Sequence, residues 1–330
     1  MQAPAGRWQH EAVTPDPVDV ARRLAEEVLL RDAPAVDAAD VIPDSHLTAL
    51  DATGLTGLAA AEPDLPTRLA VTAALAGGCL ATAFVWLQHQ GALAAVTGSP
   101  LADRFTGSLS SGALRAGVAI TALRGPAPLT ALRTGDGWRL TGSVPWVTGW
   151  NRIDLLRVAA LDGDQVVSLL LDVRTGPTLG AEPLALTAAR ASGTATLWFE
   201  EHPAPADRLI SVVPHAEWLA ADPAGLAGNG ALALGVAARA AVVAGSPALA
   251  DEASALLTAL GAADVAEIPA LRAEASALAV RAAAAGAVTE GARSVLTGST
   301  GERLTREAQF LLVFGSRPAI RQELLIRLGA

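Results

Sequence analysis

The sequence predicts a mainly helical α+β fold in three zones. Apolar residues recur with a helical period through residues 1–114 and 213–330, whereas residues 115–212 contain short apolar runs separated by Gly, Pro and Asp. A chain of 330 residues that is 51% hydrophobic can bury a sizeable core. We therefore expect an N-terminal helical domain over 1–114, a central antiparallel β-domain over 115–212 and a C-terminal four-helix bundle over 213–330.

Three helix starts are visible in the first zone. Asp16 before a proline, Pro43 before Asp-Ser, and Pro66 before Thr each precede an apolar-periodic run, which is typical of a helix N-terminus. The pair Gly77-Gly78 is expected to end the third helix, and a fourth is expected over Leu80–Val96.

One uncharged stretch, Leu69–Leu87, is long enough to cross a bilayer. Its Ala, Gly and Thr content, and the Gln88-His89-Gln90 that follows it, favour one or two buried helices. The N-terminal residues 1–17 contain no apolar signal core. We expect no membrane segment and a cytoplasmic location.

The second zone contains a hairpin signal. Asp136-Gly137 lies between two apolar-rich runs within Gly117–Trp150, and Asp-Gly tolerates the backbone of a tight turn. Further strands are expected over Leu155–Ala160, Val166–Leu171 and Ala195–Phe199.

The third zone is rich in alanine, a strong helix former. Helices are expected over Gly225–Val243, Ala248–Leu260, Ile268–Leu296 and Thr305–Leu328. Long helices with so little charge to solvate them favour a homodimer or homotetramer formed through this bundle.

The composition excludes several kinds of chemistry. The net charge of −9 disfavours a nucleic-acid partner. All 24 basic residues are arginine, and tyrosine is absent, so neither a lysine nor a tyrosine can act as acid, base or nucleophile. Cys79 is the sole cysteine and the five histidines show no metal-binding spacing, so no metal site is expected.

Three side chains stand at expected strand ends. Thr121 follows the first apolar run of the β-domain, and Trp146 and Thr148 end the strand after the hairpin turn. An indole ring and two hydroxyls can form one wall of a site for a planar cofactor that makes hydrogen bonds.

This order of residues resembles the acyl-CoA dehydrogenase family of flavoproteins, of which the chain looks like a divergent, shortened member. In that family a threonine after an apolar strand and a Trp-x-Thr element hold the flavin, so the resemblance assigns Thr121, Trp146 and Thr148 to binding FAD. The resemblance implies an oligomer in which two subunits contribute to each FAD site. It also implies that the substrate is an acyl thioester such as acyl-CoA, which is oxidised at a CH–CH bond.

The resemblance also shows what is missing. The family's base is a carboxylate nine residues after the arginine of an Arg-Asp-Ala element, which Arg306-Glu307-Ala308 matches here, and that position is Gly315. An alternative base position in the family falls near Gly225, where Asp222 is a weak candidate and Glu217 the next nearest acid. The sequence therefore does not identify the catalytic base.

Other departures leave three functions open. The family's Thr-Glu-Pro run is replaced by Thr121–Pro126, in which Arg124 could contact substrate, and His89 is a second, weak candidate for that role. A dehydrogenase is the first hypothesis. A flavin monooxygenase on the same fold, which needs no carboxylate, is the second. A catalytically silent subunit of a hetero-oligomer, or a binding scaffold, is the third.

Overall fold

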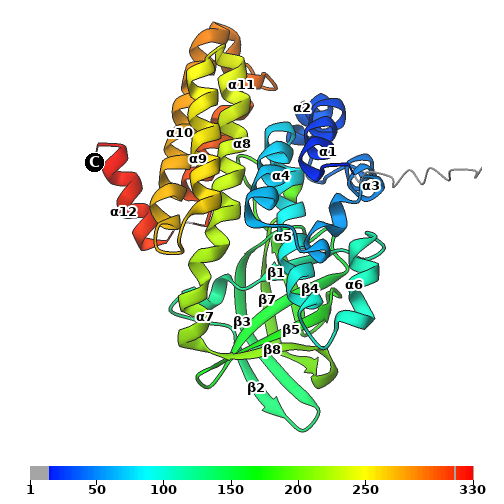
Figure 1. Ribbon diagram of the computed structural model, residues 1–330. Coiled ribbons are helices and arrows are strands. Elements are labelled where there is room, and N and C mark those ends of the chain that lie inside the picture. The colour runs from blue at the N-terminus through cyan, green and yellow to red at the C-terminus, as the bar shows by residue number, and fades with distance from the viewer. Residues whose placement is uncertain (1–14, 316, 330) are drawn as a thin grey trace, which may run out of the picture.

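The computed structural model describes residues 15–315 and 317–329. It confirms the predicted class, because the strands lie in one sheet between Ala116 and Pro214 and helices precede and follow it. The N-terminal stretch expected to lack a signal core is outside the described residues up to residue 14. Figure 1 shows the sheet at one end of the molecule, with the two groups of helices side by side at the other.

The N-terminal helices begin where the sequence indicates. Asp16 caps the first, accepting a hydrogen bond from the Val18 N–H at 2.8 Å, and the helix ending at Gly78 is broken from the next at Cys79. Leu69–Leu87 is therefore two buried helices. The elements are α1 (Pro17–Leu24), a π-helical turn η1 (Ala25–Leu29), α2 (Leu30–Ala38), α3 (Asp44–Ala52), η2 (Leu55–Ala61), α4 (Leu65–Gly78), α5 (Leu80–Thr97) and α6 (Ala102–Ser110).

The sheet has eight strands, in the order β6-β7-β3-β2-β4-β5-β8 with β1 also paired to β4. It is mainly antiparallel, although β1 and one residue of β2 pair with β4 in parallel. The strands are β1 (Ala116–Ala119), β2 (Thr130–Thr134), β3 (Gly137–Val147), β4 (Leu155–Asp162), β5 (Gln165–Asp172), β6 (Leu179–Pro183), β7 (Ala195–Pro205) and β8 (Leu209–Pro214). Short helical turns η3 (Thr121–Arg124), η4 (Arg190–Ser192) and η5 (Ala206–Arg208) lie between them.

The predicted hairpin is present, but its turn is one residue earlier than expected. Thr134 pairs with Gly137, so Gly135 and Asp136 form the loop and Gly137 is already in β3. Gly137 has a φ of +156°, and a Cβ there would lie 2.2 Å from the Ala204 carbonyl oxygen of β7. The glycine is required by strand packing rather than by the turn.

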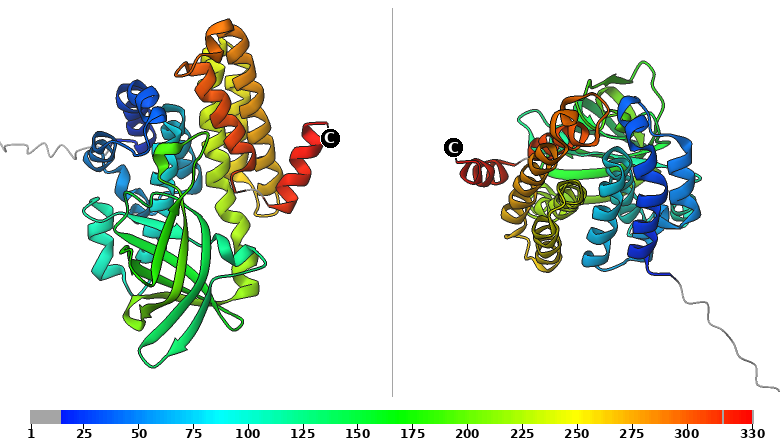
Figure 2. Two further views of the ribbon diagram at one scale, coloured as in Figure 1. Left: turned by 180° about the vertical axis from the view of Figure 1, so that it is seen from behind. Right: turned by 90° about the horizontal axis from the view of Figure 1, so that it is seen from above.

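The C-terminal helices form the predicted bundle, with two corrections. The expected helix over Ile268–Leu296 ends at Glu290, because Gly291 has a φ of +68°, and a short helical turn follows it. The expected helix over Thr305–Leu328 is two helices, because the chain leaves helical geometry at Phe314 and resumes at Pro318. The elements are α7 (His215–Ala221), η6 (Asp222–Gly225), α8 (Leu226–Ala244), α9 (Pro247–Ala262), α10 (Ile268–Glu290), η7 (Gly291–Val295), α11 (Thr300–Val313) and α12 (Pro318–Arg327). Figure 2 shows α12 projecting from the side of the bundle.

The two groups of helices share a single hydrophobic core, in which Leu75 of α4 and Leu232 of α8 are fully buried. The close approach of α8 to α4 depends on Gly235 of α8, where a Cβ would lie 2.2 Å from the Ala73 carbonyl oxygen. A second core lies within the sheet, and a third lies between the sheet and α5 and α6. Where the helical groups and the sheet meet, the packing leaves a cavity.

One helical stretch, His215–Ala244, is long and apolar enough to cross a membrane. Of its most apolar window, 67% is buried inside the protein. Core helices pass the same test of length and composition, so the stretch is weak evidence for a membrane span.

Candidate functional site

A cavity of about 960 Å³ lies between the sheet, the N-terminal helices and the bundle. This volume is at the upper end of the range for small-molecule sites. Thr121, Trp146 and Thr148, predicted from strand ends, all line it, as do Arg124, Asp222 and Gly315. The structure therefore brings together six of the eight residues that the sequence singled out, leaving out His89 and Glu217.

The first side of the cavity, which we call the β-domain wall, consists of Thr121, Trp146 and Thr148. A register shift between β3 and β7 falls between Val144 and Val147, and Trp146 within it has a φ of +63°. Such a backbone is strained for a side chain this large, and bulges of this kind redirect side chains beside binding sites. Trp146 is 51% exposed, so a ligand in the cavity can reach its side chain.

The two hydroxyls of the β-domain wall are held in place. The Thr121 hydroxyl donates to the Pro145 carbonyl, which leaves its oxygen lone pairs free to accept from a ligand. The Thr148 hydroxyl lies 3.2 Å from that of Thr194, and Thr148 is only 1% exposed. Thr148 therefore presents little more than an edge to the cavity.

The opposite side contains an aromatic wall, formed by Phe84 of α5 and by Phe310 and Phe314 at the end of α11. The Phe84 and Phe314 rings meet edge to face with centroids 4.5 Å apart, and Phe310 stacks on Phe314 at 5.4 Å. All three line the cavity. Sequence reasoning missed them, although Phe310 and Phe314 stand one helical turn apart.

A charged cluster of Arg124, Asp222 and Arg317 lies beside the aromatic wall. The Arg124 Nε is 2.9 Å from one carboxylate oxygen of Asp222 and 3.0 Å from the other, and the Arg317 Nε is 3.0 Å from the first of these. Burial by itself would raise the pKa of Asp222, but the two guanidiniums outweigh it and hold the pKa below its usual range. Asp222 is therefore a paired carboxylate with weak basicity, and it makes no capping hydrogen bond.

Gly315 occupies the position where the resemblance places a base, and it brings no carboxylate. Its φ is +63°, and a Cβ there would lie 2.6 Å from the Asn229 side-chain nitrogen. Arg272 of α10, 1% exposed, fixes this segment by donating to the carbonyls of Leu311 at 2.8 Å and Phe314 at 3.1 Å. Burial lowers the pKa of Arg272 to about 10, and the end of α11 compensates the charge.

The neighbouring Arg306-Glu307-Ala308 element is used for packing. Arg306 pairs with Asp37 of α2 and with Glu302, and it donates to the Thr187 carbonyl at 2.7 Å. Glu307 forms a buried pair with Arg303 at 3.0 Å, and neither residue lines the cavity. This element therefore joins α11 to α2.

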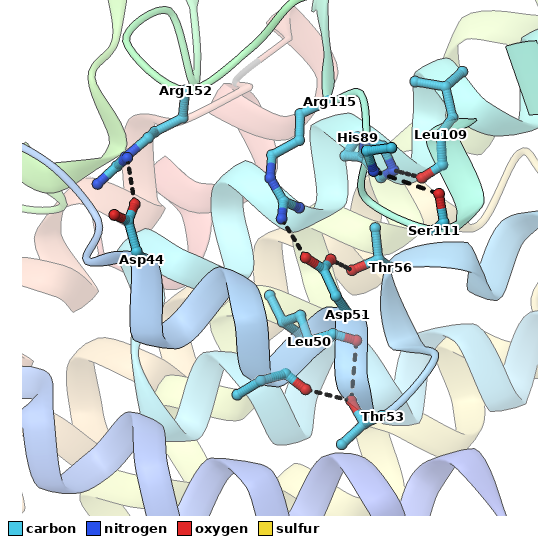
Figure 3. A network of polar contacts seen from close by, with 12 residues as sticks. Asp44, Leu50, Asp51, Thr53, Thr56, His89, Leu109, Ser111, Arg115 and Arg152 are labelled. Atoms are coloured by element: carbon cyan, nitrogen blue, oxygen red, sulfur yellow. Dashed lines mark hydrogen bonds and ion pairs between the residues drawn. The ribbon is translucent and has the colours of Figure 1, made fainter. Parts of the chain in front are cut away.

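His89, the weak candidate for substrate binding, lies outside the cavity lining. Its Nδ1 accepts from the Ala116 N–H at 3.1 Å and its Nε2 donates to the Leu109 carbonyl at 3.2 Å. Burial lowers the pKa of His89 to about 4, so the ring is neutral. Figure 3 shows His89 with Leu109 and, separately, the ion pair between Arg115 and Asp51, which joins the residue before β1 to α3.

Glu217, the other acid considered, lies in α7 and outside the lining. Among residues 15–315 and 317–329, no group of three or more His, Cys, Asp or Glu side chains is placed to hold a metal ion.

Comparison with solved structures identifies the fold. Glutaryl-CoA dehydrogenase from Mycobacterium smegmatis superposes with a TM-score of 0.82 at 18% identity, over 97% of this chain and 95% of that one. Butyryl-CoA dehydrogenase from Megasphaera elsdenii gives 0.77 at 16%, over 98% and 99%. PigA, in a complex with FAD and proline, gives 0.79 at 17%, over 98% and 99%. The chain therefore has the acyl-CoA dehydrogenase fold.

The sequence matches no protein-family model, and it has no significant match among curated proteins.

Proposed function

We propose that this chain, which has the acyl-CoA dehydrogenase fold, is a flavin-dependent oxidoreductase that holds FAD in the cavity and acts on an acyl thioester. The observation that carries the proposal is that Thr121, Trp146 and Thr148, from two different strand ends, line one cavity. Structural neighbours support it, since one is described with FAD and proline and another as a glutaryl-CoA complex.

The charge of the cavity fits such ligands. Within the part of the chain that the structure describes, its lining contains four arginines against a single carboxylate, in a chain whose net charge is −9. The phosphates of FAD and of a CoA thioester are anionic, and a concave site of one sign attracts ligands of the other. The arginines are Arg68, Arg124, Arg157 and Arg317.

The lining residues have separable tasks. Trp146 offers a flat apolar face to a ring, and the Thr121 oxygen accepts a hydrogen bond at its edge. The aromatic wall excludes water from the side where an acyl chain would lie. When bound, the flavin supplies hydride acceptance, which no side chain of the protein can provide.

Proton abstraction is the step that this cavity supports least. Asp222 is the only carboxylate that the described residues contribute to the lining, and it is neutralised by two arginines. A general base contributes about 10²–10⁴-fold to a rate. We therefore expect oxidation of a simple saturated acyl-CoA to be slower by about that factor than in a site with a free carboxylate.

The same observation favours a second candidate. A flavin monooxygenase uses reduced flavin and oxygen and requires no carboxylate at position 315, so the pairing of Asp222 does not impair it. A silent subunit remains the third candidate.

The test is the absorption spectrum of the purified protein, followed by anaerobic addition of butyryl-CoA. A flavin spectrum with slow bleaching supports a flavoenzyme with a hindered base. Rapid bleaching would show that a base other than the paired Asp222 takes the proton. NADH-dependent oxygen consumption with a thioester present would indicate the monooxygenase, and a colourless protein that takes up no FAD would contradict the proposal.

We also propose a cytoplasmic homodimer or homotetramer that associates through the bundle. Large apolar side chains are exposed at the end of the bundle farthest from the sheet, namely Val242, Val288, Val295 and Leu296. A hetero-oligomer would cover the same side chains. Sedimentation of the wild type and of Val288→Glu distinguishes association from a monomer, which would contradict the proposal.

A further inference from the structure

Arg157, in the middle of β4, is a cavity-lining cation with only neutral partners. Its Nε lies 3.4 Å from the Ser168 hydroxyl and its Nη1 lies 3.3 Å from the Gly91 carbonyl of α5. Among the residues that the structure describes, no carboxylate oxygen lies within 4.0 Å of it. A guanidinium has five N–H donors, so at least three remain unused.

Arg157 is only partly exposed, and its surroundings on the sheet are apolar. Its ladder partners are Val118 of β1 and Leu170 of β5, and both belong to the apolar core between the sheet and α5. Burial lowers the pKa of the Arg157 guanidinium. A partly desolvated cation without a counter-charge is destabilised, and a ligand that brings the opposite charge into the cavity relieves this.

The other arginines of the cavity are in a different situation. Arg124 and Arg317 share Asp222, and Arg68 is exposed to water. Among the described residues, Arg157 is thus the half-buried arginine of the lining that lacks a carboxylate. The missing partner is best supplied from the cavity itself.

We infer that Arg157 binds a carboxylate at the far end of the substrate's acyl chain, so that the cavity selects acyl thioesters with a second, anionic end. The inference rests on the proposed function and specifies its substrate class. One guanidinium matches one carboxylate through two parallel hydrogen bonds. A phosphate carries more charge and more acceptor oxygens than this single cation among apolar side chains can satisfy.

The reach is compatible with one bound molecule. Val118 is paired with Arg157, and Thr121 of the β-domain wall follows it by three residues, a span of at most about 11 Å. A short chain can therefore be held by Arg157 at one end while its reacting carbons lie near the ring site.

The experiment compares two probes of equal chain length, glutaryl-CoA and pentanoyl-CoA, by titration calorimetry on the protein as purified. Arg157→Gln should weaken glutaryl-CoA binding about 10–100-fold, the worth of a hydrogen-bonded charge pair, and change pentanoyl-CoA binding by less than about twofold. Arg157→Lys should retain part of the preference. Arg174→Gln, at an exposed position outside the cavity, is the matched control for charge.

Each other outcome overturns the inference in a distinguishable way. An equal loss for both probes would assign Arg157 to the shared CoA portion. A loss of flavin content in Arg157→Gln would assign it to the cofactor's phosphates. A flavin-containing wild type without preference for glutaryl-CoA would overturn this inference alone, whereas a protein that binds neither flavin nor thioester would overturn the proposed function as well. If Arg157→Gln does not fold, Arg157→Met, whose apolar side chain suits Val118 and Leu170, replaces it.

Discussion

The β-domain wall and the charged cluster face one cavity but are assembled in different ways. Thr121 and Trp146 stand at the ends of strands, so local strand geometry places them, and Thr121 is fixed by the neighbouring Pro145 carbonyl. The charged cluster draws Arg124 from η3, Asp222 from η6 and Arg317 from the chain before α12. Only the fold as a whole brings these three together.

This difference separates two chemical tasks. Strand ends suffice to hold a ring, whereas proton transfer requires a free carboxylate, and the acid that faces this cavity is committed to two arginines. The contrast predicts that changes in the charged cluster alter stability more than changes in the β-domain wall, which should alter flavin binding instead.

Asp222→Asn should give the largest effect. Removing the carboxylate leaves two largely buried guanidiniums without a counter-charge, and we expect a loss of about 2–3 kcal/mol in the free energy of unfolding at pH 7. The pKa of Asp222 is lowered by folding, so its contribution is complete above the unfolded pKa of about 4 and is lost as the pH falls through the lower folded pKa. Urea unfolding at pH 7 and pH 3 measures both.

The control for this substitution is Asp207→Asn, which breaks an exposed pair with Arg104 and should cost less than about 1 kcal/mol. Equal losses at Asp222 and Asp207 would show that the charged cluster is solvated and that Asp222 is available as a base.

The second prediction concerns His89, whose buried ring lies outside the cavity lining. Its pKa falls from about 6.5 unfolded to about 4 folded, so stability declines as the pH falls through this interval. Between pH 7 and pH 5 the wild type should lose about 2 kcal/mol that His89→Gln does not lose. Chemical unfolding of both proteins at the two pH values measures this difference, and identical slopes would contradict a neutral, buried ring.

Trp146→Ala tests the β-domain wall. Loss of the stacking face should reduce flavin affinity about tenfold, consistent with about 1.4 kcal/mol for an aromatic contact, while thermal stability changes little because the indole is 51% exposed. Trp198→Ala removes a similarly exposed indole outside the cavity and should leave flavin content unchanged. Unaltered flavin binding in Trp146→Ala would remove the β-domain wall from the cofactor site.

The sequence predicted what local patterns encode. The helix starts and the series of strands follow from periodicity and turn residues. The strand-end residues Thr121, Trp146 and Thr148 follow from the resemblance to a family, and the structure gathers these three in one cavity. Three errors were also local. The hairpin turn was misplaced by one residue, and the helix expected to reach Leu296 ends before Gly291. Pro318 marks a helix boundary that the sequence prediction did not place.

The remaining features depend on contacts that no local pattern contains. Arg124 and Asp222 are 98 residues apart in the chain, and Arg317 is 95 residues from Asp222. Phe84 meets Phe314 from the opposite end of the sequence, and Arg157 gave no signal because an arginine in a strand is indistinguishable from a solvated one until its neighbours are known. His89 illustrates the converse, since a polar residue in an apolar run suggested a site but completes a buried network.

At Gly315 we expect no gain in activity, because one substitution there cannot restore a base. Gly315→Ala should cost about 1–2 kcal/mol, because an L-residue is strained at a φ of +63° and its Cβ meets the Asn229 side chain. Gly107→Ala, in α6 with open space around it, should instead be neutral or stabilising. Adding Asn229→Ala to Gly315→Ala removes the contact but not the backbone strain. The part of the free energy of unfolding that is recovered, measured by urea unfolding, therefore separates the two costs.

Gly315→Glu carries the same strain, and we expect it to be less stable than the wild type without faster flavin reduction by butyryl-CoA. A stable Gly315→Glu that bleaches quickly would show that the backbone at 315 adapts, and that the helical side of the cavity lacks only a carboxylate.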